Sequence, residues 1–106
     1  MTIVDRPRSE LPSTLKGLHL FHYGGAPCAQ RVRLVLAEKG IRRGPDVPWN
    51  SEAEKHRSAP AGTYIGRTVS LPRQQNLTEA YAAIHPNLVV PALVHDGVLH
   101  IESVDI

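Results

Sequence analysis

The fold is decided by the stretch Val89-Val90-Pro91-Ala92-Leu93-Val94-His95-Asp96-Gly97-Val98-Leu99-His100-Ile101-Glu102-Ser103. Two β-rich runs, 89–94 and 98–101, flank its Asp-Gly step, and this pattern is typical of a tight hairpin between antiparallel strands. Apolar residues occupy both the odd-numbered and the even-numbered positions of the two runs, and these positions face opposite sides of a strand. We therefore expect a sheet whose two faces are both covered by helices.

Pro91 stands near the start of the first run, where a proline removes one hydrogen-bond donor from the ladder. A cis peptide bond at Pro91 would turn the backbone N–H and C=O of Val90 away from the sheet. These two groups would then be available to a peptide-like ligand.

The second run ends in Glu102-Ser103, and Ser103 is a suitable N-cap for a helix that begins at Val104. The free N–H groups and the dipole of a helix N-terminus favour a bound carboxylate. The sequence reaches only Ile106, so we expect a fold that is truncated within this helix.

A second informative stretch lies nearer the start of the chain. Residues 18–23 are bulky and partly alternating, which predicts a strand, and Gly24-Gly25 end it. Pro27 suits the first turn of a helix, and apolar residues follow at helical spacing as far as the stop signal Gly40. The sequence thus predicts a strand, a short loop and a helix in direct succession.

Together the two stretches resemble the N-terminal, thioredoxin-like domain of glutathione S-transferases. The residues that carry the resemblance are Val90-Pro91, Glu102-Ser103, Pro27, Arg31-Val32-Arg33 and Glu38-Lys39-Gly40. The resemblance extends from Leu18 to Ile106 and is weak in the middle. It implies an α/β fold, with a mixed sheet flanked by helices.

The resemblance also implies a glutathione site. In this family the residue before the cis-proline pairs its backbone with the cysteinyl part of glutathione, and a Glu-Ser pair holds the γ-glutamyl end. By position, those roles would fall to Val90, Pro91, Glu102 and Ser103. Glutathione would serve as a co-substrate.

The catalytic group of the family is a Ser, Cys or Tyr that keeps the glutathione sulfur as a thiolate. Several classes place it just before the loop proline, and that position is Ala26 here. Cys28 is one substitute, because the helix N-terminus and Arg31 favour a thiolate there. Tyr23, at the end of the strand, is the other. A lone cysteine on an apolar helical stripe is also a common core residue, so a packing role for Cys28 stays open.

The implied activity is the conjugation of glutathione to an electrophilic small molecule in detoxification, by a protein that is a dimer in this interpretation. Family members build most of the electrophile site from a second, all-helical domain, and the sequence contains no such segment. Two alternatives therefore remain. One is a non-catalytic interaction module, which Ala26 favours, and the other is a glutaredoxin-like reductase with Cys28 as its single cysteine.

Composition narrows the class of protein. The formal net charge is +2, from 12 basic and 10 acidic residues, and there is no long basic run, which argues against nucleic-acid binding. One cysteine excludes an internal disulfide, and no Cys/His spacing predicts a metal site. Neither a signal peptide nor an apolar run of membrane-spanning length is present, so we expect a cytoplasmic protein that does not bind membranes.

The sequence divides into an N-terminal arm, 1–17, expected to be disordered, and a domain over 18–106 with an extended segment at about 42–63. A strand is possible over 47–51, and β-branched residues predict a better one over 63–71. By resemblance, 68–71 would form the family's second strand. A short helix is expected from Leu77, capped by Asn76 and ended by Pro86.

Overall fold

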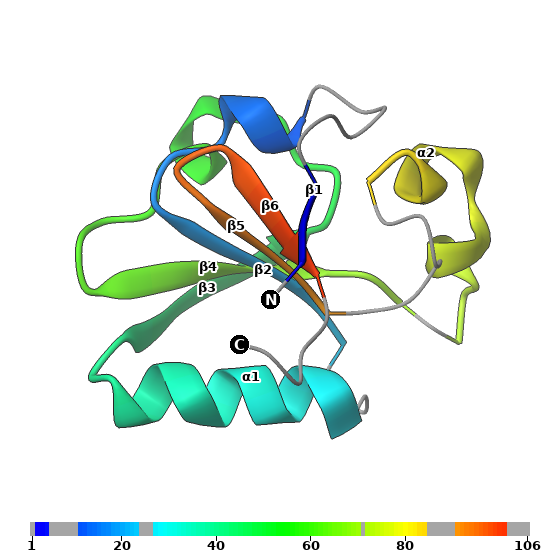
Figure 1. The fold of residues 1–106 in the computed structure, drawn as a ribbon. Helices are drawn as coiled ribbons and strands as arrows, with labels where there is room; N and C mark the ends of the chain where they lie inside the picture. Colours follow the sequence, from blue (N-terminus) through cyan, green and yellow to red (C-terminus); the bar gives the residue numbers. More distant parts are fainter. Residues whose placement is uncertain (1, 5–10, 24–26, 71, 85–90, 102–106) are drawn as a thin grey trace.

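The computed structural model describes residues 2–4, 11–23, 27–70, 72–84 and 91–101 of the chain (Figure 1). Their elements, in chain order, are β1 (Thr2–Val4), η1 (Pro12–Thr14), β2 (Leu18–His22), α1 (Pro27–Glu38), β3 (Arg42–Pro48), η2 (Glu54–His56), β4 (Thr63–Thr68), η3 (Gln75–Leu77), α2 (Glu79–Ala82), β5 (Ala92–His95) and β6 (Val98–Ile101), where η marks a 3₁₀ turn.

The strands form one mixed sheet in the order β1-β6-β5-β2-β4-β3. β2, β4 and β3 run parallel, whereas β5 is antiparallel to both β2 and β6. The β5–β6 hairpin turns at Asp96 and Gly97, which both have positive φ angles (49° and 85°), as a tight Asp-Gly turn requires. The predicted hairpin, first strand, first helix and mixed sheet are confirmed.

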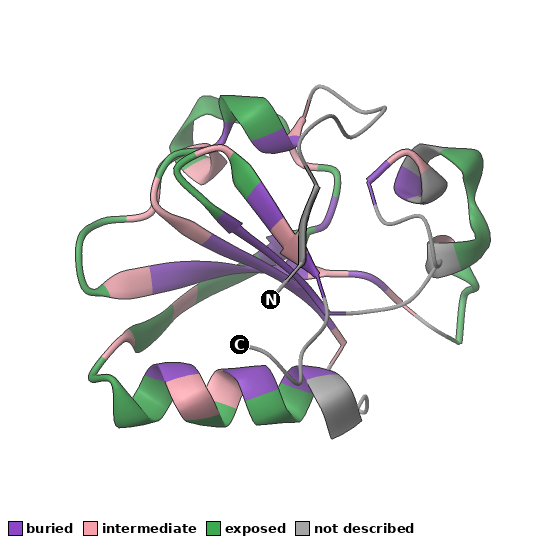
Figure 2. Cartoon of the chain, viewed as in Figure 1, coloured by how far each residue is buried: buried purple, intermediate pink, exposed green. Residues whose placement is uncertain are grey.

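The sheet buries apolar side chains on both faces, as its two-parity pattern predicted. Leu20 of β2 and Leu93 of β5 pack with Val32 and Leu36 of α1, which lies along one face (Figures 1 and 2). The cluster that includes Leu15, Phe21, Trp49, Val69, Tyr81, Ile84 and Val94 covers the other face. Consecutive residues of β2 therefore serve two separate cores.

The middle of the chain differs from the prediction. The strand beside β2 is β4, and its register runs from Leu18 opposite Tyr64 to His22 opposite Thr68. The placement of this strand at 68–71 was therefore wrong by several residues, because it followed family resemblance in the region where the resemblance is weakest. The strand considered at 47–51 begins earlier, as β3, and forms an edge of the sheet.

Two smaller differences concern local elements. No regular element was expected within residues 1–17, yet β1 pairs with β6, with Thr2 opposite Ile101, and η1 follows it. Strand pairing satisfies backbone groups and does not need a periodic sequence, which is why the pattern did not reveal it. The short helix α2 is capped by Thr78, whose Oγ1 accepts from the backbone N–H of Tyr81 at 3.3 Å, and not by Asn76.

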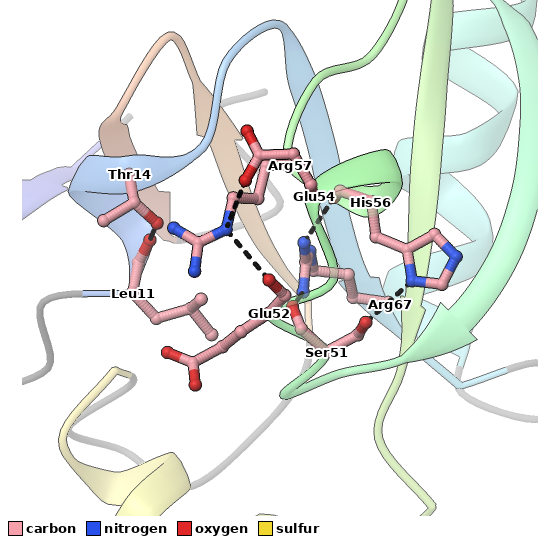
Figure 3. Close-up of polar contacts among 8 residues, drawn as sticks. All are labelled: Leu11, Thr14, Ser51, Glu52, Glu54, His56, Arg57 and Arg67. Atoms are coloured by element: carbon pink, nitrogen blue, oxygen red, sulfur yellow. Dashed lines mark hydrogen bonds and ion pairs between the residues drawn. The ribbon is translucent and has the colours of Figure 1, made fainter.

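The long connection between β3 and β4 is organised by the buried side chain of Arg67, on β4. Its guanidinium donates to the backbone carbonyls of Trp49 (3.1 Å), Ser51 (2.7 Å) and His56 (2.6 Å), and Figure 3 shows how the segment from Ser51 to His56 surrounds it. Its Nε–H donates to Nδ1 of His19 at 3.2 Å. Burial lowers the pKa of Arg67 to about 10, so it remains a cation at neutral pH.

We expect Arg67→Met to destabilise the fold strongly, because buried carbonyls would lose their donors. A cost of about 3 kcal/mol or more in the free energy of unfolding follows from roughly 1–3 kcal/mol for each unsatisfied group. Urea unfolding, followed by Trp49 fluorescence, measures it. Arg67→Lys should recover only part of the loss, because an ammonium lacks the planar fork of donors. Arg42→Met, at an exposed arginine of β3, is the control, and equal midpoints for the Arg42 and Arg67 variants would contradict this role.

Candidate functional site

The ends of several strands meet at one edge of the sheet, and this edge is the candidate binding site (Figure 1). The parallel strands β2, β4 and β3 all end here, and α1 begins just after β2. β5 begins at this edge because Ala92 pairs with Phe21, and β6 ends at it because His100 pairs with Leu93. In open α/β sheets, ligands bind outside the carboxyl ends of the parallel strands.

A cleft of about 470 Å³ opens at this edge, next to the ends of β2, β4 and β3. It is lined by Tyr23, Asp46, Val47, Pro48, Thr68, Ser70, Arg73 and Gln75.

The loop that follows β4 is held in place from within. The side-chain Oε1 of Gln75 accepts from the backbone N–H of Ser70 at 2.8 Å, and the backbone N–H of Gln75 donates to the carbonyl of Ser70 at 3.0 Å. Arg73, between them, is exposed, and no ion pair joins it to another described residue. The cleft is therefore lined by an exposed guanidinium, which can pair with a carboxylate of a ligand, and by Tyr23, whose side chain also packs against the apolar cluster around Phe21 and Tyr81.

Two of the sequence-predicted site residues lie at this edge within the described ranges. Tyr23 directly follows β2 and is one of the residues that line the cleft. Pro91 is buried immediately before β5. The backbone of Cys28 lies in the first turn of α1, at the same end of the sheet.

The remaining predictions fall outside the description. Val90, Glu102 and Ser103 are not among the described residues, and neither is the side chain of Cys28. Their roles in binding glutathione or in catalysis, and a cis bond at Pro91, stay predictions.

Sequence reasoning missed several residues of the cleft. Ser70, Arg73 and Gln75 were not singled out, although a polar loop directly after a strand is a usable signal for a site at that strand's end. Asp46 was missed because the strand considered at 47–51 starts after it, whereas β3 begins at Arg42.

A hydrogen-bonded cluster lies next to the cleft, centred on the buried His22 at the end of β2. Its Nδ1 lies 3.1 Å from an Nη1 of Arg33 on α1, and its Nε2 lies 3.1 Å from an Oδ1 of Asp46 on β3. Arg33 can only donate, so Nδ1 accepts and Nε2 carries the proton that it gives to Asp46. The ring is thus neutral, and burial is the main reason why its pKa lies below the ordinary value.

The cluster needs a glycine beside it. A Cβ at Gly66 of β4 would come within 2.6 Å of Nε2 of His22 and would also collide with Oδ1 of Asp46. Asp46 is held from its other side by Arg43, whose Nη2 donates to Oδ2 at 2.6 Å. The elements β2, β3, β4 and α1 therefore pack closely around the ring of His22.

His19 lies on the opposite face of β2 from His22, because the two residues are three positions apart on a strand. Nε–H of Arg67 donates to its Nδ1, and its Nε2 donates to the carbonyl of Lys16 at 2.8 Å. Burial again is the largest cause of a lowered pKa. Both buried histidines of β2 are therefore kept neutral with an arginine as the donor to Nδ1.

Neither a metal cluster nor a membrane span is found where the structure is described. Within those ranges, no group of three or more His, Cys, Asp or Glu side chains is arranged to hold a metal ion. The helices of the same ranges are all too short or too polar to cross a membrane.

The parallel and antiparallel strands, with a helix directly after the first strand of the core, define a thioredoxin-like α/β domain. The sequence profile described as "Glutathione S-transferase, N-terminal domain" matches residues 26–106. The chain belongs to this family. No curated protein sequence matches the chain significantly.

Three proteins serve as examples of the solved structures that share the fold. They are the beta-etherase LigF of Sphingobium sp. strain SYK-6 (22% identity, TM-score 0.58, 83% of this chain and 28% of that one), a Sulfitobacter glutathione transferase homolog with bound glutathione (20%, 0.59, 86% and 34%) and Ure2p in complex with glutathione (23%, 0.58, 84% and 32%). The chain thus spans about a third or less of the length of these proteins.

Because the two histidines of β2 are neutral in the folded chain, we expect the free energy of unfolding to depend on pH. Both have a folded-state pKa below the ordinary 6.5, so below that pH the unfolded chain binds protons that the folded chain does not. Their contribution to stability is complete above pH 6.5 and is lost as the pH falls below it. Urea midpoints between pH about 7.5 and about 5.5 measure the slope.

Variants assign this slope to the two residues. His22→Gln and His19→Gln should each reduce the pH dependence of the urea midpoint. A wild-type midpoint that stays constant over this range would contradict the neutral state of both rings.

Proposed function

We propose that this chain is the glutathione-binding domain of a glutathione transferase. The observation that carries the proposal is the cleft at the carboxyl edge of a glutathione S-transferase N-terminal fold, which offers Tyr23 and the exposed Arg73. Glutathione is a tripeptide with two carboxylates, and it suits a site that combines a guanidinium with free backbone groups. Two structures that share this fold contain glutathione.

The binding roles follow the family pattern. The backbone of Val90, exposed by a cis bond at Pro91, pairs with the cysteinyl part of the tripeptide. Glu102 and Ser103 hold the γ-glutamyl end. Arg73 extends the site on the far side of β2, where it attracts the second carboxylate.

The proposed reaction is attack of the glutathione thiolate on an electrophilic carbon. The sulfur lone pair forms the new S–C bond, the bond to the leaving group breaks with its electron pair, and the thiol proton passes to solvent. Tyr23 is the preferred catalytic group, because its hydroxyl donates to the sulfur and favours the thiolate. Cys28 is the other candidate, in the first turn of α1.

The whole enzyme is needed for the reaction, because the electrophile site of the family lies mainly in a second domain. We place the protein in the cytoplasm, in detoxification and in a homodimer. The single cysteine, which fits a reducing compartment, supports the first of these assignments.

A non-catalytic interaction module is the second candidate function, and Ala26 favours it. Ala26 supplies no hydroxyl or thiol at the position where several classes of the family place the catalytic group. A module of this kind would bind glutathione without activating its sulfur. A glutaredoxin-like reductase instead requires a reactive Cys28, so loss of thiol exchange in Cys28→Ser would favour it.

Calorimetry should detect glutathione binding at millimolar or tighter affinity. Ser103→Ala should abolish it, and Arg73→Met should weaken it by about tenfold, because a charge-assisted hydrogen bond is lost. Arg42→Met, an exposed arginine away from the cleft lining, is the matched control and should bind as the wild type does. A folded wild-type chain that does not bind glutathione would rule out the proposal.

Tyr23→Phe separates the transferase from the interaction module. If the hydroxyl activates the sulfur, the ultraviolet absorbance of the bound thiolate should titrate at higher pH in Tyr23→Phe than in the wild type. The affinity for glutathione should change less than the thiol pKa does. An identical titration in both proteins would exclude Tyr23 and turn attention to Cys28→Ser.

A further inference from the structure

We propose that Arg43 determines the specificity of the cleft for ligands that end in a free carboxylate, because its guanidinium neutralises Asp46 in the cleft wall. For its preferred ligand, glutathione, this inference rests on the proposed function. The contact between Arg43 and Asp46 itself belongs to the chain without any ligand.

Two charged residues of opposite sign line the cleft. Within the described part of the chain, Asp46 is its one acidic lining residue and Arg73 its one basic lining residue. Arg73 attracts a carboxylate, whereas an uncompensated Asp46 repels it, since charges at a protein surface interact over about 8 Å at physiological salt. An anion site with Asp46 in its wall therefore needs a second cation that offsets this carboxylate.

Arg43 supplies this cation, although it is not itself one of the residues that line the cleft. Its Nη2 donates to Oδ2 of Asp46 at 2.6 Å in a charge-assisted hydrogen bond. The other oxygen, Oδ1, accepts from Nε2–H of the neutral His22 at 3.1 Å. Both carboxylate oxygens of Asp46 therefore have a donor, and of these two donors only Arg43 carries a charge.

An irregularity in β3 brings the two side chains together. Arg43 lies opposite Tyr64 and Asp46 lies opposite Gly66, so three steps along β3 correspond to two along β4. In a regular strand, residues three positions apart face opposite sides, and the extra residue of a bulge returns them to the same side. A Cβ at Gly44 would lie 2.7 Å from the carbonyl oxygen of Tyr64, so this bulge needs its glycine.

The ion pair lies at the surface, so its main effect is on the charge of the cleft and not on stability. The side chains of Arg43 and Asp46 are 48% and 43% exposed. Exposed ion pairs contribute little to the free energy of unfolding. Loss of the Arg43 guanidinium should therefore leave the fold intact and leave Asp46 as an uncompensated negative charge in the wall.

Variants change the charge of the wall in known steps. Arg43→Met leaves Asp46 uncompensated, and Arg43→Lys keeps the positive charge. Asp46→Asn removes the negative charge but keeps an oxygen that accepts from His22. Arg42→Met removes an equal charge from the neighbouring exposed residue of β3, on the other face of the strand, and is the matched control.

Calorimetry with glutathione at low salt measures the effect. Arg43→Met should bind roughly twofold to fivefold more weakly than the wild type, and Asp46→Asn should bind more tightly by a similar factor. Arg43→Met/Asp46→Asn should return to the wild-type affinity, and Arg43→Lys and Arg42→Met should stay close to it. Salt at about 1 M should remove these differences. Equal affinities of the wild type and Arg43→Met at low salt would overturn the proposal.

Glutathione whose glycyl carboxylate has been converted to an amide distinguishes an effect of charge from a change in the shape of the cleft. The amide has nearly the same size but no charge at this end. The wild type and Arg43→Met should therefore bind it with equal affinity. If Arg43→Met loses as much affinity for the amide as for glutathione, Arg43 acts on the shape of the cleft, and the proposal is overturned.

The proposed function and this inference can fail separately. If a folded wild-type chain does not bind glutathione, the proposed function ends, and the dipeptide alanylglycine and its amide replace glutathione as probes. Magnetic resonance shifts of the Ser70 and Arg73 amides should then show that alanylglycine binds more weakly to Arg43→Met than to the wild type, with no such difference for its amide. An equal response of both proteins to alanylglycine, or none in either, would refute the inference.

Discussion

The rest of this structure depends on the hydrogen bonds that the buried guanidinium of Arg67 donates. No carboxylate among the described residues pairs with it, and backbone carbonyls of Trp49, Ser51 and His56 satisfy it instead. A buried cation can only be retained if its donors are used, and here their use fixes a connection that has little regular structure of its own. The segment between β3 and β4 is therefore specified by one side chain that lies after it in sequence.

This arrangement has consequences for the candidate site. With the connection fixed, β3 lies parallel to β4 at the edge of the sheet and brings Asp46 to the cleft. β3 is the edge strand on this side of the sheet. It gives the cleft one wall, formed by Asp46, Val47 and Pro48, that the resemblance alone did not imply.

β2 links the hydrogen bonds of Arg67 to the residues of the cleft, because it carries a buried histidine on each face. His19 accepts from Arg67 on one side, and His22 accepts from Arg33 on the other. In both cases an arginine, which can only donate, selects the tautomer and disfavours the charged ring. The central strand is thus stabilised by neutral imidazoles, and only the one beside the cleft has a direct connection to the proposed ligand site.

The sequence by itself determined the elements that local chemistry specifies. Asp96-Gly97 marked the hairpin, Pro27 and Gly40 bounded the first helix, and two-parity apolar runs required a sheet covered on both faces. Tertiary structure alone decided the rest. The position of β4, the pairing of β1, the burial of Arg67 and the meeting of His22 with Asp46 and Arg33 all join residues distant in sequence. Their energies come from partners that no local pattern reveals, which is why Arg73 and Asp46 entered the candidate site only once the strands were placed.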